Sequence, residues 1–323
     1  MNFLESIEKF PQQFLFQPQI KNAKRLKKAD YFIVLGMGGS ALAADLLKTR
    51  FPKKSLFIHK NYGLPSLADQ ILKKSLVIAC SYSGDTEEVL DGYNEAQKKK
   101  MPVAVISSGG KLLNKAKKNR SPYIQIPNFN IQPRLALGLM SKALAAFMQD
   151  KILFQELSFL AWTLKPQLFQ KQGQKIARTL YKRIPIIYAS TANEALAYHW
   201  KISFNENTKI PAFYNVFPEL NHNELSCFDS HSSTKILSEK FSILLLEDKK
   251  DEPRIQKRMA VLKKILRTNN FNIQEIKLLN HSESEKIFSS VLLANWSSYY
   301  LAKKYFIDPE SVPLVEKFKK WIK

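Results

Sequence analysis

From residue 30 onward, short apolar runs alternate with segments of helical periodicity, and this alternation constrains the fold more than any other feature. Strands alternating with helices of this length build βαβ units. We therefore expect an α/β fold with a mostly parallel sheet flanked by helices. In the first half, the expected strands are 30–36, 55–60, 75–81, 101–108 and 121–126, and the expected helices are 40–48, 86–99, 111–118 and 134–149.

The second half repeats this alternation more loosely. A chain of 323 residues is long for one hydrophobic core. We therefore predict two domains of similar architecture, with domain 1 at 1–150, a helical linker at 151–175 and domain 2 at 176–323. In the second half, the expected strands are 184–190, 241–248 and 271–278, and the expected helices are 166–183, 193–204, 254–268, 291–305 and 312–322.

The composition is that of an ordinary globular protein, with 45% hydrophobic and 24% charged residues. The first residues lack the basic start and apolar run of a signal peptide. The richest apolar stretch, 152–164, contains polar residues and is too short to span a bilayer. The two cysteines form no disulfide framework and no metal-spaced cluster. We expect a soluble cytoplasmic protein with no membrane contact, no structural metal and no cofactor.

The formal net charge of +22 raises the question of a nucleic-acid partner. The lysines are scattered over expected helices and turns, and no DNA- or RNA-binding motif organises them. We therefore interpret the charge as a solvated basic surface and expect no nucleic-acid partner. Such a surface still attracts an anionic metabolite.

Glycine usage indicates where a ligand binds. The chain has ten glycines and none after Gly173. Six of them follow an expected strand and precede an expected helix, where glycine lets the backbone turn tightly and present amide groups to a ligand. In open α/β sheets, ligands bind at this edge. The first domain is therefore the expected anion-binding domain. The six are Gly36, Gly38, Gly39, Gly84, Gly109 and Gly110.

The first of these loops matches a dinucleotide fingerprint, G-x-G-x-x-A, at residues 36–41. That fingerprint also requires an acidic residue about twenty positions later for the ribose hydroxyls. Residues 46–68 contain no Asp or Glu, and the second strand ends at Lys60. The sequence therefore disfavours a dinucleotide cofactor.

The second loop, 81–88, places three hydroxyls around a strand-to-helix turn. A hydroxyl-lined helix start suits a phosphate monoester, whose oxygens accept several hydrogen bonds. Asp85 and Glu88 have capping-box spacing, which is the purely structural interpretation of the two carboxylates. We expect the phosphate to bind the hydroxyls and backbone amides, with these carboxylates pointing away from it.

Residues 205–224 form a polar segment with an aromatic centre, and we do not expect a core strand there. Its mixture of side chains suits the wall of a pocket. Glu206 and His222 are ionisable side chains of this segment, although by themselves a glutamate at a helix end is usually solvated and a histidine between two asparagines usually lies in a surface turn.

Five ordered motifs resemble the bifunctional phosphoglucose/phosphomannose isomerases, which are built from two sugar-isomerase (SIS) domains. The resemblance covers the chain from about residue 30 to the C-terminus. It implies two SIS-type domains and a metal-independent aldose–ketose isomerase. The implied reaction interconverts glucose 6-phosphate, mannose 6-phosphate or both with fructose 6-phosphate through an enediolate. The motifs are GMGGSA, SYSGDTEE, PR at 133–134, FNENTK and PELNHNE.

The resemblance also implies roles for individual residues. Glu206 matches the proton-transfer base, and Arg134 matches the arginine that stabilises the anionic intermediate. His222 matches the histidine that opens the sugar ring, which in the family comes from the partner subunit and implies a homodimer with shared active sites. Lys319 aligns best with the C-terminal lysine, with Lys317, Lys320 and Lys323 nearby. The implied phosphate site consists of Gly38, Gly39, Ser40, Ser81, Ser83 and Thr86.

Three departures from the family pattern bear on substrate choice. His199 replaces an arginine, Asp85 stands where asparagine is frequent, and residues 227–228 differ from the usual Gly-Trp. Two alternatives keep the fold: an isomerase of another sugar phosphate, such as an amino-sugar phosphate, and a non-catalytic SIS-domain sugar-phosphate sensor. A sensor needs the phosphate loops but no base, so the residues that match catalytic groups argue against it.

Overall fold

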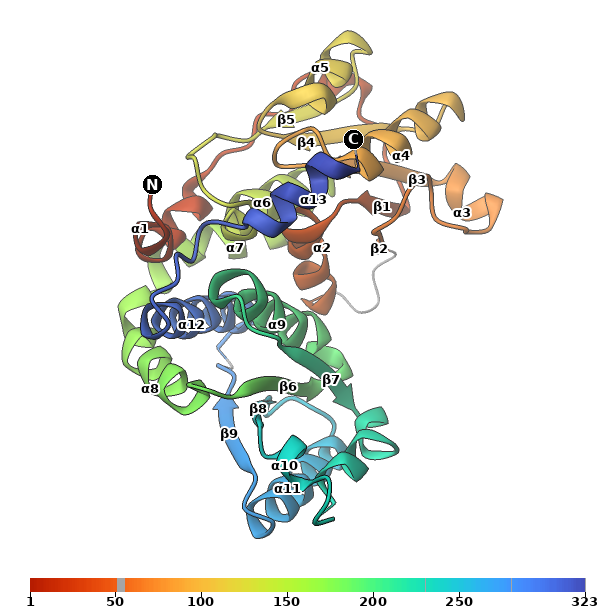
Figure 1. Cartoon of the computed structure of the whole chain (residues 1–323). Helices are drawn as coiled ribbons and strands as arrows, with labels where there is room; N and C mark the ends of the chain where they lie inside the picture. Colours follow the sequence, from red (N-terminus) through yellow and green to blue (C-terminus); the bar gives the residue numbers. More distant parts are fainter. Residues whose placement is uncertain (51–55, 230, 280, 323) are drawn as a thin grey trace. The chain divides into compact units, whose positions relative to one another are not determined.

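The computed structural model describes residues 1–50, 56–229, 231–279 and 281–322. The chain forms two compact units, each built around its own sheet (Figure 1). The first comprises Met1 and Lys9–Thr163, and the second comprises Asn2–Glu8 and Leu164–Lys323. The division at residue 163 falls inside the expected linker, while the domain limits given above stay a prediction.

The first unit contains a five-stranded parallel sheet in the order β2-β1-β3-β4-β5. All five expected strands are present, although residue 55 of the expected 55–60 strand lies outside the described residues. Successive connections run outward from the centre in opposite directions, so right-handed crossovers place helices on both faces. The strands are β1 (Tyr31–Leu35), β2 (Leu56–His59), β3 (Ser75–Cys80), β4 (Val103–Ser107) and β5 (Tyr123–Gln125).

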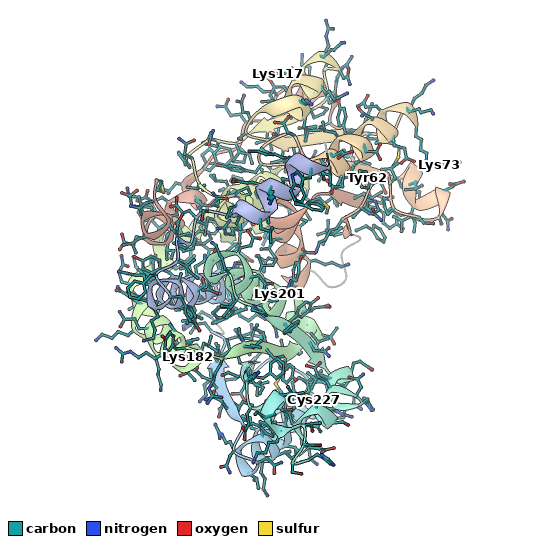
Figure 2. All side chains as sticks on the ribbon, in the orientation of Figure 1. Tyr62, Lys73, Lys117, Lys182, Lys201 and Cys227 are labelled. Atoms are coloured by element: carbon teal, nitrogen blue, oxygen red, sulfur yellow. The ribbon has the colours of Figure 1, made fainter. Side chains whose placement is uncertain are left out.

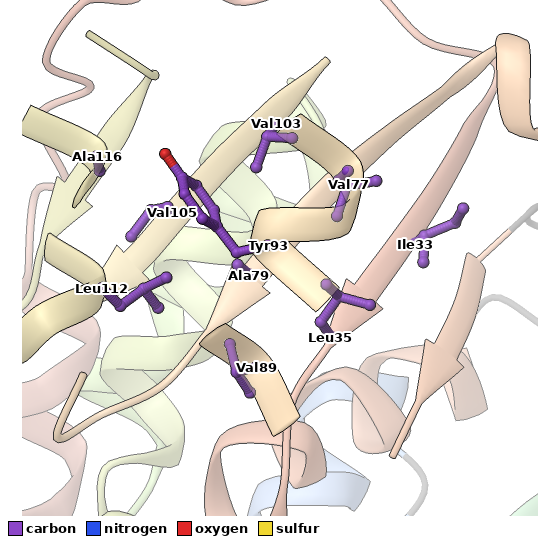
Figure 3. Packing of buried hydrophobic residues seen from close by; sticks show 11 residues of the cluster. Ile33, Leu35, Val77, Ala79, Val89, Tyr93, Val103, Val105, Leu112 and Ala116 are labelled. Atoms are coloured by element: carbon purple, nitrogen blue, oxygen red, sulfur yellow. The ribbon is translucent and has the colours of Figure 1, made fainter. Parts of the chain in front are cut away.

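Nine helical segments belong to this unit, counted over its described residues. Alternate side chains of β1, β3 and β4 pack against α4 and α5 on one face, where Tyr93 is fully buried (Figure 3). The segments are η1 (Phe10–Leu15), η2 (Ala23–Arg25), α2 (Gly38–Arg50), α3 (Asp69–Lys73), α4 (Glu87–Lys98), α5 (Gly110–Lys118), η3 (Pro133–Leu135), α6 (Leu137–Phe147) and α7 (Lys151–Thr163).

The second unit contains a four-stranded parallel sheet in the order β7-β6-β8-β9. Its core lies between β6, β8 and α11, with Tyr188 and Phe217 packed edge to face. The strands are β6 (Ile184–Ser190), β7 (Phe213–Phe217), β8 (Phe241–Glu247) and β9 (Asn272–Lys277).

The longest helix of this unit, α12, is buried over most of its surface. Its Trp296 donates a hydrogen bond to the Pro166 carbonyl at 2.8 Å, and Gly173 lies so close that an added Cβ would be 2.7 Å from the Trp296 Cβ. The helical segments are α1 (Phe3–Glu8), η4 (Pro166–Phe169), α8 (Gln170–Leu180), η5 (Thr191–Asn193), α9 (Glu194–Thr208), η6 (Glu219–Asn221), η7 (Glu224–Phe228), α10 (Lys235–Ser238), α11 (Pro253–Thr268), α12 (Glu283–Lys304) and α13 (Pro313–Trp321).

Strand β7 lies inside segment 205–224, where no strand was expected. It pairs only with β6 among the described strands, and its residues are mostly half-buried. An edge strand keeps one side in solvent and tolerates polar residues such as Asn215. The expectation that this segment is not a core strand is correct, but the strand itself was missed.

Basic side chains are spread over both units. In the view with all side chains (Figure 2), Lys201 on α9 and Lys182 in the turn between α8 and β6 belong to the second unit. Lys73 on α3 and Lys117 on α5 belong to the first. In the part of the chain that the structure describes, no helix is long and apolar enough to cross a membrane.

Candidate functional site

The first candidate region is the loop between β1 and α2. Gly38 has a left-handed backbone with φ of 49°. A Cβ on Gly39 would lie 2.6 Å from the backbone nitrogen of Arg134, so only glycine allows these two backbones to approach. Arg134 is 5% exposed and contacts the Gln132 side chain at 3.3 Å. The structure therefore brings Gly39 and Arg134 together, two residues far apart in the sequence.

The loop after β3 joins the same region. The Ser40 hydroxyl accepts a hydrogen bond from the Tyr82 amide at 3.0 Å. Ser81 and Thr86 share a hydrogen bond at 2.8 Å between their hydroxyls, and the Gly84 amide donates to the Ser81 hydroxyl at 3.0 Å. Two of the hydroxyls predicted for the phosphate, Ser81 and Thr86, are therefore bonded to each other, and a third, Ser40, is bonded to the backbone of the residue after Ser81.

Ser83 lies apart from these hydroxyls. It is exposed, and its hydroxyl accepts a weak hydrogen bond from the Asp85 amide at 3.4 Å. A third loop packs against it, because a Cβ on Gly110 would lie 2.4 Å from the Ser83 carbonyl oxygen. Glycine therefore allows the loops after β3 and β4 to approach closely, while the Ser40 bond links the loops after β1 and β3.

The capping-box interpretation of Asp85 is wrong. The N-cap of α4 is Thr86, which makes no side-chain capping bond. The Asp85 carboxylate instead accepts a hydrogen bond from the Lys111 amide, in the first turn of α5, at 3.1 Å. A carboxylate at this helix start complements the helix dipole, and the bond directs the Asp85 charge toward α5.

The second candidate region is the C-terminal end of α9, which carries Glu206. Glu206 is half-buried in the last turn of the helix. The side chains on either side are bonded: Asn205 donates to the Ile210 carbonyl at 3.0 Å, and Asn207 donates to the Ser298 hydroxyl at 2.9 Å. These bonds fix the helix end that presents Glu206.

The remaining predicted residues lie on separate elements of the second unit. His222 is exposed and directly follows η6. Lys319 is exposed on α13, where Lys317 places its ammonium 4.5 Å from the centre of the Trp321 ring. Lys323 lies outside the described residues.

His199, one of the departures from the family pattern, is on α9 two turns before Glu206. It is 2% exposed, and its Nδ1 is a buried atom with no hydrogen-bond partner. Burial lowers the pKa of His199 to about 3, so the imidazole is neutral at physiological pH. The charge of an arginine at this position is therefore absent here.

The sequence analysis missed a buried polar network at the carboxyl ends of β6 and β8. Ser190 donates to Asp251 at 2.6 Å, and Asn193 donates to Asp248 at 3.2 Å. Lys286 forms a buried ion pair with Asp248 at 2.6 Å. The sequence did contain a signal for this network, because acidic residues directly follow the apolar run of β8. Polar groups at that position lie at the carboxyl ends of the parallel strands.

The two carboxyl groups of this network titrate differently. Burial alone would raise the pKa of Asp248, but hydrogen bonds from Lys286, the Lys250 amide and Asn193 outweigh it and lower that pKa. Burial raises the pKa of Asp251, whose Oδ2 has no hydrogen-bond partner. Among the described residues, no group of three or more His, Cys, Asp or Glu side chains could hold a metal ion.

The chain resembles known proteins over nearly its whole length. Residues 169–322 match the family model described as the bacterial phospho-glucose isomerase C-terminal SIS domain. A bifunctional phosphoglucose/phosphomannose isomerase from Aquifex aeolicus is 34% identical over 98% of this chain and 97% of its own. A protein of the same name from Caldicellulosiruptor bescii is 33% identical over 97% of this chain and 96% of its own.

More distant similarities are to other sugar-phosphate proteins. A D-glucosamine-6-phosphate 4-epimerase from Sulfolobus acidocaldarius is 28% identical over 72% of this chain and 73% of its own. The crystal structure of glucosamine-6-phosphate deaminase from Thermotoga maritima superposes with a TM-score of 0.70 at 13% identity, over 96% of this chain and 97% of that one. At such low identity, the structural likeness shows the shared fold.

Proposed function

The chain belongs to the family of bifunctional phosphoglucose/phosphomannose isomerases, and we propose that it interconverts glucose 6-phosphate, mannose 6-phosphate or both with fructose 6-phosphate. The reaction transfers one proton between C1 and C2 through an enediolate and uses no metal ion. The family is shown by identities above 30% along nearly the full chain.

One observation carries the binding part of the proposal: hydrogen bonds hold three hydroxyls on the loops after β1 and β3, beside glycines that allow close backbone contacts. Ser40, Ser81 and Thr86 meet at the carboxyl ends of β1 and β3, next to the Gly39–Arg134 contact. In a doubly wound sheet this switch point is where ligands bind. A phosphate there accepts hydrogen bonds from hydroxyls and from amides at a helix start. We assign these hydroxyls, with Gly38 and Ser83, to the substrate phosphate.

The catalytic groups are assigned on the family motifs. Glu206 is the base that takes the proton from one carbon and returns it at the next, since one carboxylate can reach two adjacent carbons. Arg134 stabilises the enediolate by its positive charge. His222 opens the sugar ring, and Lys319 assists at the same centre. We propose that His222 acts across a homodimer interface and that the enzyme is cytoplasmic.

A second candidate substrate is an amino-sugar phosphate. The epimerase relative of Sulfolobus acidocaldarius, whose name refers to D-glucosamine 6-phosphate, favours this alternative. The neutral, buried His199 supports altered substrate choice, because it replaces the arginine of the family pattern.

The test is a coupled assay with glucose 6-phosphate, mannose 6-phosphate and glucosamine 6-phosphate, each with and without a chelator. Glu206→Gln keeps the shape of the side chain but cannot accept the proton. We expect its turnover to fall by about two to four orders of magnitude with nearly unchanged sugar-phosphate affinity. Glu239→Gln, an exposed carboxylate of the same unit, is the matched control.

Solvent deuterium provides an independent measurement. In the wild type, deuterium should enter the product at C1 or C2, because the proton on the carboxylate exchanges with water. Full activity of Glu206→Gln, or loss of wild-type activity with the chelator, would overturn the proposal.

The shared site has its own test. We expect Glu206→Gln and His222→Ala subunits to have strongly reduced activity alone and to regain activity when mixed, because a mixed dimer contains one intact site. No recovery despite demonstrated subunit exchange would contradict a site shared between subunits.

A further inference from the structure

Lys209 lies at the junction of two backbone segments in the second unit. Its ammonium donates to the Glu206 carbonyl at 2.7 Å and to the Asp308 carbonyl at 2.8 Å. The first acceptor is the backbone of the proposed base. The second belongs to the segment that follows α12 and leads into α13. One side chain therefore connects the end of α9 to the start of the C-terminal segment.

The position of Lys209 explains why it is available for this bond. It is the C-cap of α9 and has a left-handed backbone with φ of 55°. The last carbonyls of a helix lack intrahelical donors, and a cation there complements the helix dipole. A lysine in the capping position can fold back onto the carbonyl three residues earlier. The helix ends at Thr208, two residues after Glu206, and the Lys209 ammonium supplies a donor for the Glu206 carbonyl in its last turn.

The Asp308 end of this bridge is a defined turn. The Asp308 carboxylate accepts hydrogen bonds from the Glu310 amide at 2.9 Å and the Ser311 amide at 3.2 Å. The hydrogen bond from the Glu310 amide is the main reason that the pKa of Asp308 is lowered, and Lys209 adds to the effect by its charge. Lys209 therefore attaches to a turn that is itself held rigid.

We propose that Lys209 is a positioning residue for the isomerisation: it fixes the backbone of Glu206 and anchors the segment preceding α13. This rests on the proposed function, because it takes Glu206 to be the base. The side-chain amides of the two residues that flank Glu206 are bonded elsewhere: Asn205 donates to the Ile210 carbonyl, and Asn207 donates to the Ser298 hydroxyl. Lys209 reaches across to the C-terminal segment through its bond to the Asp308 carbonyl.

The experiment compares Lys209→Met, Lys209→Arg and Lys100→Met. Methionine keeps the length of the stem and loses the donors, while arginine restores two or more donors. Lys100 is the matched control, since it is also an exposed lysine with φ of 55° directly after a helix C-cap. For each variant we would measure kcat, KM, melting temperature and the isotope effect with substrate deuterated at C2.

We expect Lys209→Met to lower kcat about ten- to a hundred-fold, because displacing a catalytic group by about 1 Å has effects of this size. KM should stay within about two-fold, because the phosphate is bound by the first unit. The isotope effect should increase, as proton transfer becomes slower relative to binding and release. Lys209→Arg should recover most of kcat, and Lys100→Met should behave as the wild type.

Amide hydrogen exchange measures the anchor independently of activity. In Lys209→Met, exchange should become faster in the last turn of α9 and in residues 308–312, and unchanged in the first unit. Unchanged exchange overturns the inference, as does a kcat loss that only follows the loss of folded protein. Faster exchange in an enzyme inactive on every tested sugar phosphate would support the anchor and overturn the proposed function.

Discussion

The two sheets differ most at their carboxyl edges. In the first unit, this edge consists of glycine-containing loops, and the closest contacts involve backbone: Gly39 against residue 134, and Gly84 against Gly109. In the second unit, the same edge is occupied by buried charged and polar side chains, including Asp248 and Lys286.

The difference shows two uses of one architecture. Backbone amides and hydroxyls leave an edge suited to bind an anion, whereas paired carboxylates and a lysine satisfy one another and repel a phosphate. We infer that the first edge is kept for a ligand and that the second edge stabilises its own unit.

The largest effect should come from Lys286→Met. Removing the lysine leaves buried Asp248 without its cation, and breaking a buried ion pair costs about 3–5 kcal/mol of unfolding free energy. Lys99→Met breaks the exposed pair with Glu95 in the first unit and should cost only about 0.3–0.5 kcal/mol. Urea unfolding measures both values. Equal costs would show that the second edge is not a stabilising network.

Gly84→Ala should have the next largest effect. Gly84 has φ of 81°, and a Cβ would lie 1.9 Å from the Gly109 carbonyl oxygen, so the loop must move. Strain of this kind costs about 1–3 kcal/mol, and phosphate affinity should fall with it. Gly109→Ala is the control, since nothing lies within 4 Å of its Cβ. Similar stability and affinity of the two variants would contradict the importance of the backbone contact.

Lowering the pH should destabilise the second unit through His199. Burial lowers the pKa of His199 to about 3, against about 6.5 in an unfolded chain. Between these values the unfolded chain binds more protons, so stability falls by about 1.4 kcal/mol per pH unit as pH decreases. His199→Gln should remove this slope between pH values of about 6.5 and 5, where few carboxyl groups titrate. The exposed His281→Gln is the control, and an unchanged slope in His199→Gln would contradict the prediction.

The smallest effect should separate two serines at the carboxyl ends of strands, Ser81 after β3 in the first sheet and Ser190 at the end of β6 in the second. Ser81→Ala removes one phosphate donor and should weaken inorganic phosphate binding about five-fold, or roughly 1 kcal/mol. Ser190→Ala removes the hydrogen bond to Asp251 and should lower stability without changing phosphate affinity. Calorimetry and urea unfolding distinguish the two results. Reversed effects would show that the ligand edge was assigned to the wrong sheet.

The sequence predicted the parallel strands well, because buried strands such as β3 and β8 are continuous apolar runs between turn residues. It missed β7, since an edge strand needs only partial burial and its polar residues conceal the pattern. The helix predicted at 291–305 begins earlier, at Glu283, where Ser282 caps it by accepting a hydrogen bond from the Glu285 amide.

The candidate site was predictable where one short segment carries the chemistry. The hydroxyls of Ser81 and Thr86 are such a case, and they share a hydrogen bond, whereas Ser83 of the same segment lies apart from them. Contacts between distant segments were not predictable, because side-chain reach depends on packing. The bridge from Lys209 to Asp308 and the ion pair of Lys286 with Asp248 are examples.

The N-terminal helix α1 has a consequence for biosynthesis. Phe3 stacks on Tyr299 of α12 with ring centres 6.1 Å apart, and Phe3 and Ile7 are buried. The ribosome makes α1 well before α12, so this docking closes a very long stretch of chain into one loop, which is entropically costly and slow. Phe3 and Ile7 must therefore wait without their α12 partners until α12 has been synthesised. A tag fused ahead of Met1 should disturb the second unit, which is completed last, before it disturbs the first.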